Sequence, residues 1–550
     1  FTEFHRYHSM SFDKQTITHK WTKRQQLSLI GPHFLLFFIV LSTLIILIFT
    51  LNYDHNWGGD FSAYIMQAKS ICEFSTTQFV ENNRITIEQS SRRIGPIAYP
   101  WGFPLMLAPI YYFFGLNFFA LKILGALFYI ILLVILWYGF EQFESLVWRS
   151  IYLFLFAVNP TLVGFTNNVL SDIPFLCFST ITICLISFII VEQRILWTPI
   201  KDRILLGTII ACSFFVRTNG ILLIFVLCWS QLANTCVLLW KNYKHEMVWR
   251  DIFIIFWKRG LMEQNNKILL FVPYIVFSCL IIIWRLILPS GGSSHFEHLS
   301  HINTESIKGN SIYYSSLLAD FFTGIPDFGK YSGKQVTYIS TLPLVAIGIV
   351  KNIRNSHHVL VYIFLTYLLF ILWPHKQGLR FLFPVLPFYL FFLMSGLSSV
   401  INRKNLWGRI TTQILCLFSI TFILFQFATI SISQARAKPK SGNVRVDGLM
   451  SDTSLEMFNF IRQNTTLQDT IVFFKPRVMR LMTERNTLGI DSVDDIFVAD
   501  YICFYKKIYP FHIELMQSTN QKKTAEIKFS NKHYTIYKLQ QTVSEIISED

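Results

Sequence analysis

The stretch HFLLFFIVLSTLIILIFTLNYDHNWGGDFSAYIMQAKSI, residues 33–71, leads from an apolar run directly to a carboxylate. Residues 33–52 contain no Asp, Glu, Lys or Arg and match the roughly 20 apolar residues that a helix needs to cross a bilayer. Asp60 follows, and Tyr64 comes four residues later, a spacing that places acid and phenol on one face of a helix. The stretch therefore predicts a membrane span, followed by a helix that lies along the membrane surface and opens with an acid.

Composition places the whole chain in the same class. Of its 550 residues, 52% are hydrophobic and only 15% are charged, which is not the usage of an ordinary soluble globular protein. The net charge of +15 comes from basic residues gathered in short segments between apolar runs, which is the orientation signal of a membrane protein. No basic soluble module with interleaved aromatic residues is present, so we expect no nucleic-acid partner. The sequence predicts a polytopic α-helical membrane protein.

Apolar runs predict about eleven transmembrane helices. They lie near residues 33–52, 118–140, 147–166, 172–191, 203–219, 220–240, 268–288, 337–352, 358–374, 380–399 and 409–432. We expect the basic residues 1–32 to be a cytoplasmic tail, which also places the basic loop 241–267 inside. Because an odd number of spans puts the two termini on opposite sides, the C-terminus is predicted to be extracytoplasmic. The predicted location is the cell (inner) membrane.

Two long outer loops interrupt the predicted transmembrane domain, residues 33–432. They cover residues 53–117 and 289–336. Within the first loop, the segment Trp101–Gly115 has an apolar core that is too short to cross the membrane and is interrupted by two prolines. We therefore expect a half-inserted or interfacial hairpin there.

The composition changes after the last predicted span. From about residue 440 polar residues increase, and helical patterns alternate with strand patterns. The helical patterns are SLEMFNFIRQN and PRVMRLMTE, and the strand patterns are TIVFF, AEIKFS and YTIYKL. These predict a small α/β domain over residues 440–550 on the outer face. Cys72 and Cys503 lie outside the apolar runs and form either a disulfide or two free thiols.

Cations stand at the outer ends of predicted spans, where the orientation rule predicts few of them. They are Lys122, Arg217, Arg285 and Arg380. Any one of them could simply extend its charge to the interface, but four at one depth suit a lipid phosphate, and the planar fork of Arg fits phosphate oxygens. Asp60 and Asp172 share this level, and for each the plain alternative is a helix N-cap.

These charges suit the transfer of a sugar from a polyprenyl phosphate to an acceptor hydroxyl. Because phosphate leaves as a stabilised anion, one carboxylate base and a group of cations suffice, without a second carboxylic acid. We expect Asp60 to be the base and Arg380, with the neighbouring cations, to hold the phosphate. Asp172 is the second catalytic candidate. Alternatively, the two carboxylates share a divalent cation such as Mg²⁺ or Mn²⁺.

Four further side chains are predicted to line the substrate site. They are Tyr64, Tyr99, His375 and Lys376. Tyr64 shares the helical face of Asp60, whereas for His375 and Lys376 the plain alternative is an ordinary solvated loop.

Five stretches resemble the motifs of one family. They are GGDFSAYIMQAKSI (58–71), AYPWGFPLMLAPIYYFFG (98–115), NPTLVGFTNNVLSDIPFLCF (159–178), VRTNGILL (216–223) and GLRFLFPVLPFYLFF (378–392). In this order they are similar to the motifs of the GT-C membrane glycosyltransferases, in the branch of protein O-mannosyltransferases and aminoarabinose transferases of lipid A. The resemblance implies an inverting transferase with a polyprenyl-phosphate-linked donor and a glycan, lipid or protein acceptor. It also implies that Asp60 is a base or metal ligand, and it matches Asp172 and Arg380 to further family motifs.

The chain departs from this family in three places. Phe61 follows Asp60 where many members add a second acid, which weakens the case for a metal. Tyr99 stands where aminoarabinose transferases often have a lysine, which weakens that choice of substrate. Thr218 and Asn219 replace a usual proline and its acidic neighbour.

Two other functions are compatible with the same residues, namely a flippase or transporter of lipid-linked sugars and a non-catalytic relative that binds them. Transporters tend to keep ionisable groups near the midplane of their spans, whereas here the polar groups gather at one face. A non-catalytic relative is expected to have lost one acid, and Asp60 and Asp172 are both present.

Overall fold

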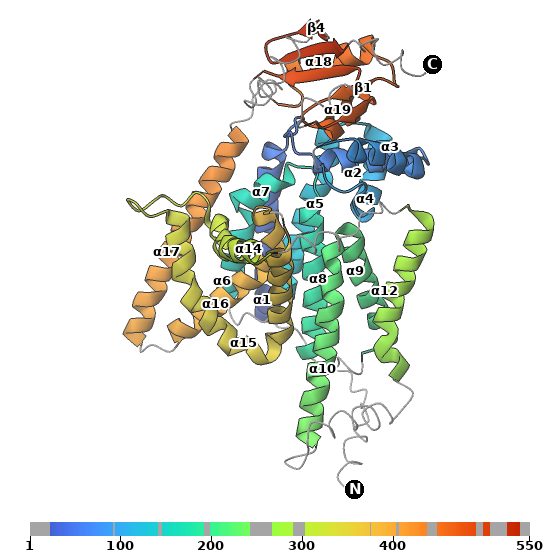
Figure 1. The fold of residues 1–550 in the computed structure, drawn as a ribbon. Coiled ribbons are helices and arrows are strands. Elements are labelled where there is room, and N and C mark those ends of the chain that lie inside the picture. Colours follow the sequence, from blue (N-terminus) through green and yellow to red (C-terminus); the bar gives the residue numbers. More distant parts are fainter. Residues whose placement is uncertain are drawn as a thin grey trace.

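The computed structural model folds the chain into a helical bundle with a small sheet domain at one end (Figure 1). It describes residues 23–91, 94–140, 146–191, 198–242, 267–289, 303–374, 376–402, 406–436, 448–490, 499–506 and 525–539. Residues 1–22 of the predicted cytoplasmic tail, residues 1–32, therefore lie outside the described residues.

The helices follow one another along most of the chain. They are α1 (Lys23–Thr50), α2 (Asp60–Cys72), α3 (Thr76–Glu88), α4 (Gly102–Phe114), α5 (Phe118–Gly139), α6 (Leu146–Ala157), α7 (Pro160–Thr166), α8 (Asp172–Val191), α9 (Ile200–Val216), η2 (Thr218–Ile221), α10 (Leu222–Asn242), α12 (Lys267–Ile287), α14 (Thr304–Leu317), η4 (Leu318–Phe322), α15 (Gly333–Leu372), η5 (Leu379–Val385), α16 (Leu386–Asn402), α17 (Leu406–Arg436), α18 (Asp452–Asn464) and α19 (Pro476–Thr483). The strands are β1 (Thr470–Val472), β2 (Asn486–Leu488), β3 (Tyr501–Tyr505), β4 (Ala525–Ser530) and β5 (Tyr534–Leu539).

Eight of the described helices are long and apolar enough to cross a membrane, or nine if the bent pair α6 and α7 forms one span. The prediction of a polytopic membrane protein is confirmed, but the count of eleven is not. One reason is α9, which has 17 residues and opens with three charged side chains. The other is that α15 contains the predicted span 337–352 and all but the last two residues of the predicted span 358–374; its two helical parts meet at a kink at Ser356.

Two glycines let α15 and α16 approach each other closely. A Cβ on Gly348 would lie 1.9 Å from the carbonyl oxygen of Phe392, and a Cβ on Gly396 would lie 1.8 Å from that of Leu344. Small residues at such crossings allow backbones to pack against each other within a membrane. Because α16 continues directly from η5, this contact also fixes the position of Arg380.

The segment Trp101–Gly115 forms the single helix α4 and not the predicted hairpin. Its Pro104 lies in the first turn, where a missing N–H breaks no helical hydrogen bond, so the helix continues past it. With 13 residues, α4 is about 20 Å long and too short to span a bilayer, as the sequence predicted.

The C-terminal domain contains a five-stranded sheet in the order β2-β1-β3-β5-β4. Strand β1 is parallel to β2 and β3, whereas β5 is antiparallel to β3 and β4. The predicted helices α18 and α19 and the predicted strands β1, β4 and β5 are confirmed. Strands β2 and β3 were not predicted. Strand β2 has only three residues, NTL, and β3 is a short, continuously apolar run, YICFY, so neither shows the alternation of polar and apolar residues that marks a strand.

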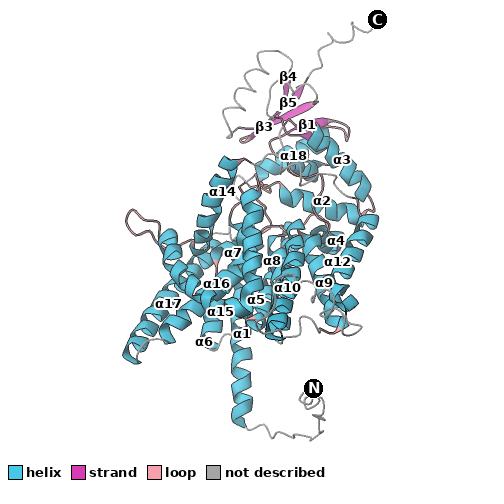
Figure 2. Cartoon of the chain, turned by 60° about the horizontal axis from the view of Figure 1, so that its bottom comes forward, coloured by secondary structure: helices cyan, strands magenta, loops and turns pink. Residues whose placement is uncertain are grey.

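The C-terminal domain lies on α2 and α3 and shares a hydrophobic core with them (Figures 1 and 2). Phe61 and Tyr64 of α2 belong to the same buried cluster as Phe458 of α18 and Val478 of α19. Trp57, just before α2, packs against Phe458 with ring centroids 6.2 Å apart. The domain is therefore part of the surface that surrounds α2.

Cys72 and Cys503 do not form a disulfide. The thiol of Cys72 donates to the carbonyl oxygen of Ala108 at 3.2 Å, and Cys503 is buried within β3. Both cysteines are free.

Candidate functional site

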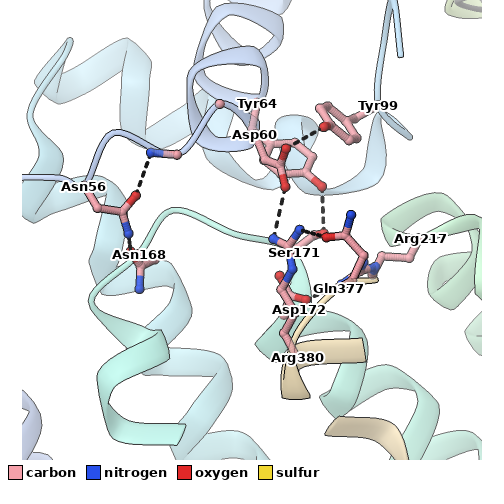
Figure 3. A network of polar contacts seen from close by, with 12 residues as sticks. Asn56, Asp60, Tyr64, Tyr99, Asn168, Ser171, Asp172, Arg217, Gln377 and Arg380 are labelled. Atoms are coloured by element: carbon pink, nitrogen blue, oxygen red, sulfur yellow. Dashed lines mark hydrogen bonds and ion pairs between the residues drawn. The ribbon is translucent and has the colours of Figure 1, made fainter. Parts of the chain in front are cut away.

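Two acids and two arginines from separate segments meet at the end of the bundle nearest the C-terminal domain (Figures 1 and 3). Asp60 opens α2, Asp172 opens α8, Arg217 follows the last residue of α9, and Arg380 lies in η5. The structure therefore brings together four of the seven acids, lysines and arginines that the sequence singled out.

A hydrogen bond between two loops holds the starts of α2 and α8 together (Figure 3). Asn56 donates to the side-chain oxygen of Asn168 at 2.6 Å, and its own side-chain oxygen accepts from the backbone N–H of Gly58 at 2.9 Å. These bonds connect the turn before Asp60 to the turn before Asp172. The two acids thus keep a fixed spacing although they belong to different helices.

Asp60 is held between a phenol and a guanidinium. Tyr99 donates to Oδ1 at 2.7 Å, and Nη1 of Arg380 donates to Oδ2 at 3.0 Å. Burial opposes ionisation, but the charge of Arg380 and the hydrogen bond from Tyr99 outweigh it, so the pKa of Asp60 lies below its ordinary value. The Asp60 side chain is 32% exposed, so the carboxylate is both ionised at neutral pH and accessible.

Asp172 is buried and paired with Arg217. Its side chain is only 2% exposed, and Nη1 of Arg217 donates to its Oδ1. The Arg217 guanidinium also lies against aromatic rings, 5.1 Å from the ring centroid of Phe381 and 6.0 Å from that of Phe175. Asp172 therefore forms an ion pair with Arg217, in addition to its position in the first turn of α8.

The two ion pairs are linked to each other. The hydroxyl of Tyr64 on α2 and the hydroxyl of Ser171, next to Asp172, share a hydrogen bond of 2.9 Å. Phe381 contacts both arginines, because the Cζ of Arg380 lies 5.5 Å from the centroid of its ring and the Cζ of Arg217 lies 5.1 Å from it. The charges therefore form one cluster and not two independent pairs.

Tyr99 is fixed by Gln67, which lies two turns after Asp60 on α2. The Gln67 amide donates to the Tyr99 carbonyl at 2.9 Å and accepts from the Tyr99 N–H at 3.1 Å. Burial raises the pKa of Tyr99, so its hydroxyl stays protonated and remains a donor to Asp60. The sequence predicted Tyr64 on the helical face of Asp60 and gave Tyr99 only as a side chain that lines the substrate site. In the structure the ring centroids of the two tyrosines lie 4.6 Å apart, and Tyr99 bonds to Asp60.

Lys122 does not join the cluster. Its side chain is fully buried, and its ammonium donates to the carbonyl oxygens of Asn52 and Asp54 and to the side chains of Asn52 and Asn167, the last at 3.0 Å. Four protein oxygens already surround this charge, so the position does not support the predicted phosphate-binding role. Lys122 instead fastens the end of α1 to α5 and α7.

The remaining candidates lie away from the acids. Arg285 is exposed in the last turn of α12. Lys376 is exposed, and its ammonium lies 5.4 Å from the ring centroid of Tyr313. With Glu305, Ser306, Gly309, Asn310 and Pro374 it lines an open pocket. His375 lies outside the described residues.

Two residues near the acids were missed by sequence reasoning. Gln377 accepts from Nη2 of Arg380 at 2.6 Å, and its spacing three residues before Arg380 was a signal that could have found it. Arg477 comes from α19 of the C-terminal domain and lies over the ring of Tyr99. No local pattern connects it to the membrane domain.

The cluster fits a divalent metal ion poorly. Each oxygen of Asp60 already accepts a hydrogen bond, and Asp172 is paired with a guanidinium. In the part of the chain that the structure describes, no group of three or more His, Cys, Asp or Glu residues could hold a metal. Both carboxylates are paired with arginines, so a divalent cation here would compete with two guanidiniums and would depend on water and the donor phosphate for its other ligands.

Comparisons with known proteins agree with this architecture. Residues 332–476 match the Alg9-like mannosyltransferase family. No curated protein sequence matches the chain. The chain is similar to ArnT from Cupriavidus metallidurans bound to undecaprenyl phosphate, at 10% identity and a TM-score of 0.54, over 91% of this chain and 97% of that one. It is also similar to the archaeal oligosaccharyltransferase AglB from Archaeoglobus fulgidus in complex with an inhibitory peptide and a dolichol-phosphate, at 9% identity and a TM-score of 0.52, over 93% of this chain and 74% of that one.

These similarities establish the fold. The chain has the GT-C fold, as its five motifs predicted, and the segment that matches the mannosyltransferase family contains Arg380.

The buried ion pair gives a stability test. Replacing Arg217 by Leu leaves the Asp172 carboxylate buried without its partner, so we expect the free energy of unfolding to fall by about 3–5 kcal/mol. Adding Asp172→Asn should restore part of this loss, because the unpaired charge is then removed. Thermal unfolding of the purified protein in detergent measures both effects.

The matched control is Arg285→Leu, which removes an exposed arginine at a helix end and should change stability by no more than about 0.5 kcal/mol. Equal melting temperatures for Arg217→Leu and Arg285→Leu would contradict the buried pair.

Proposed function

We propose that the protein is an inverting glycosyltransferase that moves a sugar from a polyprenyl-phosphate-linked donor to an acceptor hydroxyl. The proposal is carried by the ionised, partly exposed Asp60, held between Arg380 and Tyr99 at one end of a GT-C bundle (Figure 3). The similar structures support a lipid phosphate as the donor group, since ArnT is bound to undecaprenyl phosphate and AglB is in complex with a dolichol-phosphate.

Asp60 takes the proton of the acceptor hydroxyl. As the acceptor oxygen bonds to the anomeric carbon, the bond between this carbon and the phosphate oxygen breaks on the opposite face, which inverts the centre. The proton ends on the carboxylate of Asp60, and the electron pair of the broken bond leaves with the polyprenyl phosphate. Because phosphate is a good leaving group, the step needs no separate acid.

Arg380 and Arg217 stabilise the charge that gathers on the departing phosphate. Both guanidiniums are held against the ring of Phe381 before the reaction, so little reorganisation is needed as charge develops. Arg380 also bonds to Asp60, which places the base and the leaving group beside the same cation. Asp172 acts as a positioning residue, because it fixes Arg217.

The reaction takes place on the outer face of the cell (inner) membrane, with the N-terminus cytoplasmic and the C-terminal domain extracytoplasmic. This orientation is supported by the basic residues of the tail and of the loop 241–267. The acceptor is a glycan, a lipid or a protein. The open pocket beside Lys376, close in sequence to Gln377 and Arg380, provides polar groups for a hydroxylated acceptor.

The role of Asp60 is tested by incubating the purified protein with a panel of polyprenyl-phosphate sugars and measuring the release of polyprenyl phosphate. Asp60→Asn removes the base and keeps the shape, so we expect turnover to fall by about 100-fold to 10,000-fold. Asp452→Asn, which changes an exposed acid at the start of α18, is the matched control and should leave turnover intact.

Two outcomes would overturn the proposal. A folded Asp60→Asn protein that turns over as fast as the parent would show that Asp60 is not the base. Movement of lipid-linked sugar across vesicles, without any release of polyprenyl phosphate, would identify a flippase.

The hydrogen bond from Tyr99 predicts a change in pH dependence. Asp60 has a lowered pKa, so activity is kept above that pKa and is lost as the pH falls through it. Tyr99→Phe removes a hydrogen bond to the ionised form, so the acid limb of kcat/KM should move to higher pH by about one unit. Tyr112→Phe changes an exposed phenol and should leave the profile unchanged. If the acid limb of kcat/KM did not move in Tyr99→Phe, the hydrogen bond from Tyr99 would not control the pKa of the catalytic base.

We also propose that transfer needs no divalent cation, since arginines neutralise both carboxylates. Turnover in excess EDTA should equal turnover in Mg²⁺ or Mn²⁺. A loss of activity in EDTA that added Mg²⁺ or Mn²⁺ reverses would show that the acids share a metal ion after all.

A further inference from the structure

One arginine of the C-terminal domain is buried against the loop that carries Tyr99. Arg477 lies in the first turn of α19, above α2 in Figure 1, and only 1% of its surface is exposed. Its Nη2 donates to the carbonyl oxygen of Pro96, whereas Nε and Nη1 have no hydrogen-bond partner among the described residues. A buried guanidinium with unmet donors destabilises the fold by itself. Its presence therefore points to a role outside the C-terminal domain.

The loop between α3 and α4 is shaped around this guanidinium. Gly95 has a φ of 120°, in the region that favours glycine, and a Cβ there would lie 3.1 Å from Nη1 of Arg477. The Cζ of Arg477 also lies 5.6 Å from the ring centroid of Tyr99, within the range of a cation–π contact. The backbone at Gly95 and the ring of Tyr99 thus both lie against the cation.

The same tyrosine connects Arg477 to the proposed base. Its ring contacts the guanidinium, and its hydroxyl donates to Oδ1 of Asp60 at 2.7 Å. We propose that Arg477 is a positioning residue of the catalytic centre, which fixes Tyr99 and adds a positive charge near Asp60. The C-terminal domain is then a required part of the transferase. This inference rests on the proposed function and extends it to a domain for which the sequence predicted no role.

Few charged groups act on Asp60 in the described part of the chain. Arg380 and Tyr99 bond to it, Tyr64 lies one turn further along α2, and Arg477 acts from α19. Of the other ionised groups nearby, Asp172 is paired with Arg217 and also acts on Arg380, and Lys69 is paired with Glu73 and Glu484. Burial raises the pKa of Asp60, and Arg380, Tyr99 and, to a smaller extent, Arg477 together bring it below its ordinary value.

The test compares the pH dependence of polyprenyl phosphate release in Arg477→Met and Arg477→Lys. We expect Arg477→Met to move the acid limb of kcat/KM to higher pH, in the same direction as Tyr99→Phe. The shift should be smaller than the 1–3 units that an opposite charge within about 4–6 Å produces. Arg477→Lys keeps the charge over the ring and should restore most of the profile of the parent.

Arg480→Met is the matched control on the same helix. Arg480 donates to the carbonyl oxygen of Asn82 at 2.6 Å and to the hydroxyl of Thr86 at 2.8 Å, so its loss weakens the docking of the domain at α3. It should lower the melting temperature and leave the acid limb in place. A parental acid limb in Arg477→Met, or identical profiles for the Met and Lys variants, would reduce Arg477 to a purely structural residue.

A second measurement does not depend on activity. Melting temperatures of Asp60→Asn, Arg477→Met and the double variant form a double-mutant cycle. If Arg477 stabilises the charge of Asp60, removing it should lower the melting temperature less once Asp60 is neutral. Strictly additive changes would overturn the inference even if no donor sugar were found. Conversely, a non-additive cycle in a protein that releases no polyprenyl phosphate would refute the proposed function and leave the contact between the two residues standing.

Discussion

The ion pair between Asp60 and Arg380 joins two parts of the chain that are 320 residues apart. It forms only because the first outer loop and the late helices end at the same side of the bundle. The hydrogen bond between Asn56 and Asn168 brings the start of α2 to the start of α8, and the close contact of α15 with α16 brings η5 to the same place. Buried and partly buried ion pairs contribute little net stability, because the cost of desolvating both charges offsets their attraction. The presence of two of them at one end of an apolar bundle is better explained by the chemistry they support than by the folding of the bundle.

The C-terminal domain, which lies outside the transmembrane helices, packs against the candidate site through both apolar and polar contacts. Its helices bury Phe458 and Val478 in the same cluster as Phe61 of α2. Apolar burial of this kind is non-directional and sets only the approximate position of the domain. The polar contacts fix its orientation, such as those of Arg480 with α3 and of Arg477 with the carbonyl of Pro96. The apolar contact thus brings the domain to α2, and the arginines determine which side chains meet.

The sequence predicted what local patterns encode. Apolar runs marked the membrane class. The cations that broke the orientation rule included Arg217 and Arg380, and Asp60 and Asp172 were predicted at the same level, so all four members of the acid and arginine cluster were singled out. The same rule misassigned Lys122, because the four oxygens around its ammonium come from segments that only the tertiary fold brings together. Arg477 was missed for a related reason. Its partners lie on the loop before α4, and nothing in the amphipathic pattern of α19 distinguishes an arginine that faces another domain from one that faces water.

The lowered pKa of Asp60 has a mechanistic consequence. A carboxylate with a lowered pKa is a weaker base, and it is poorly suited to removing a proton from a free hydroxyl before the attack begins. It is suited to a reaction in which the bond to phosphate is largely broken first, since the attacking oxygen becomes acidic only as it bonds to the electron-poor anomeric carbon. In the proposed reaction Arg380 therefore has a double effect, because it weakens the base and stabilises the leaving phosphate. The two effects agree if departure of the phosphate leads and proton transfer follows, and this order is the one that a glycosyl phosphate donor favours.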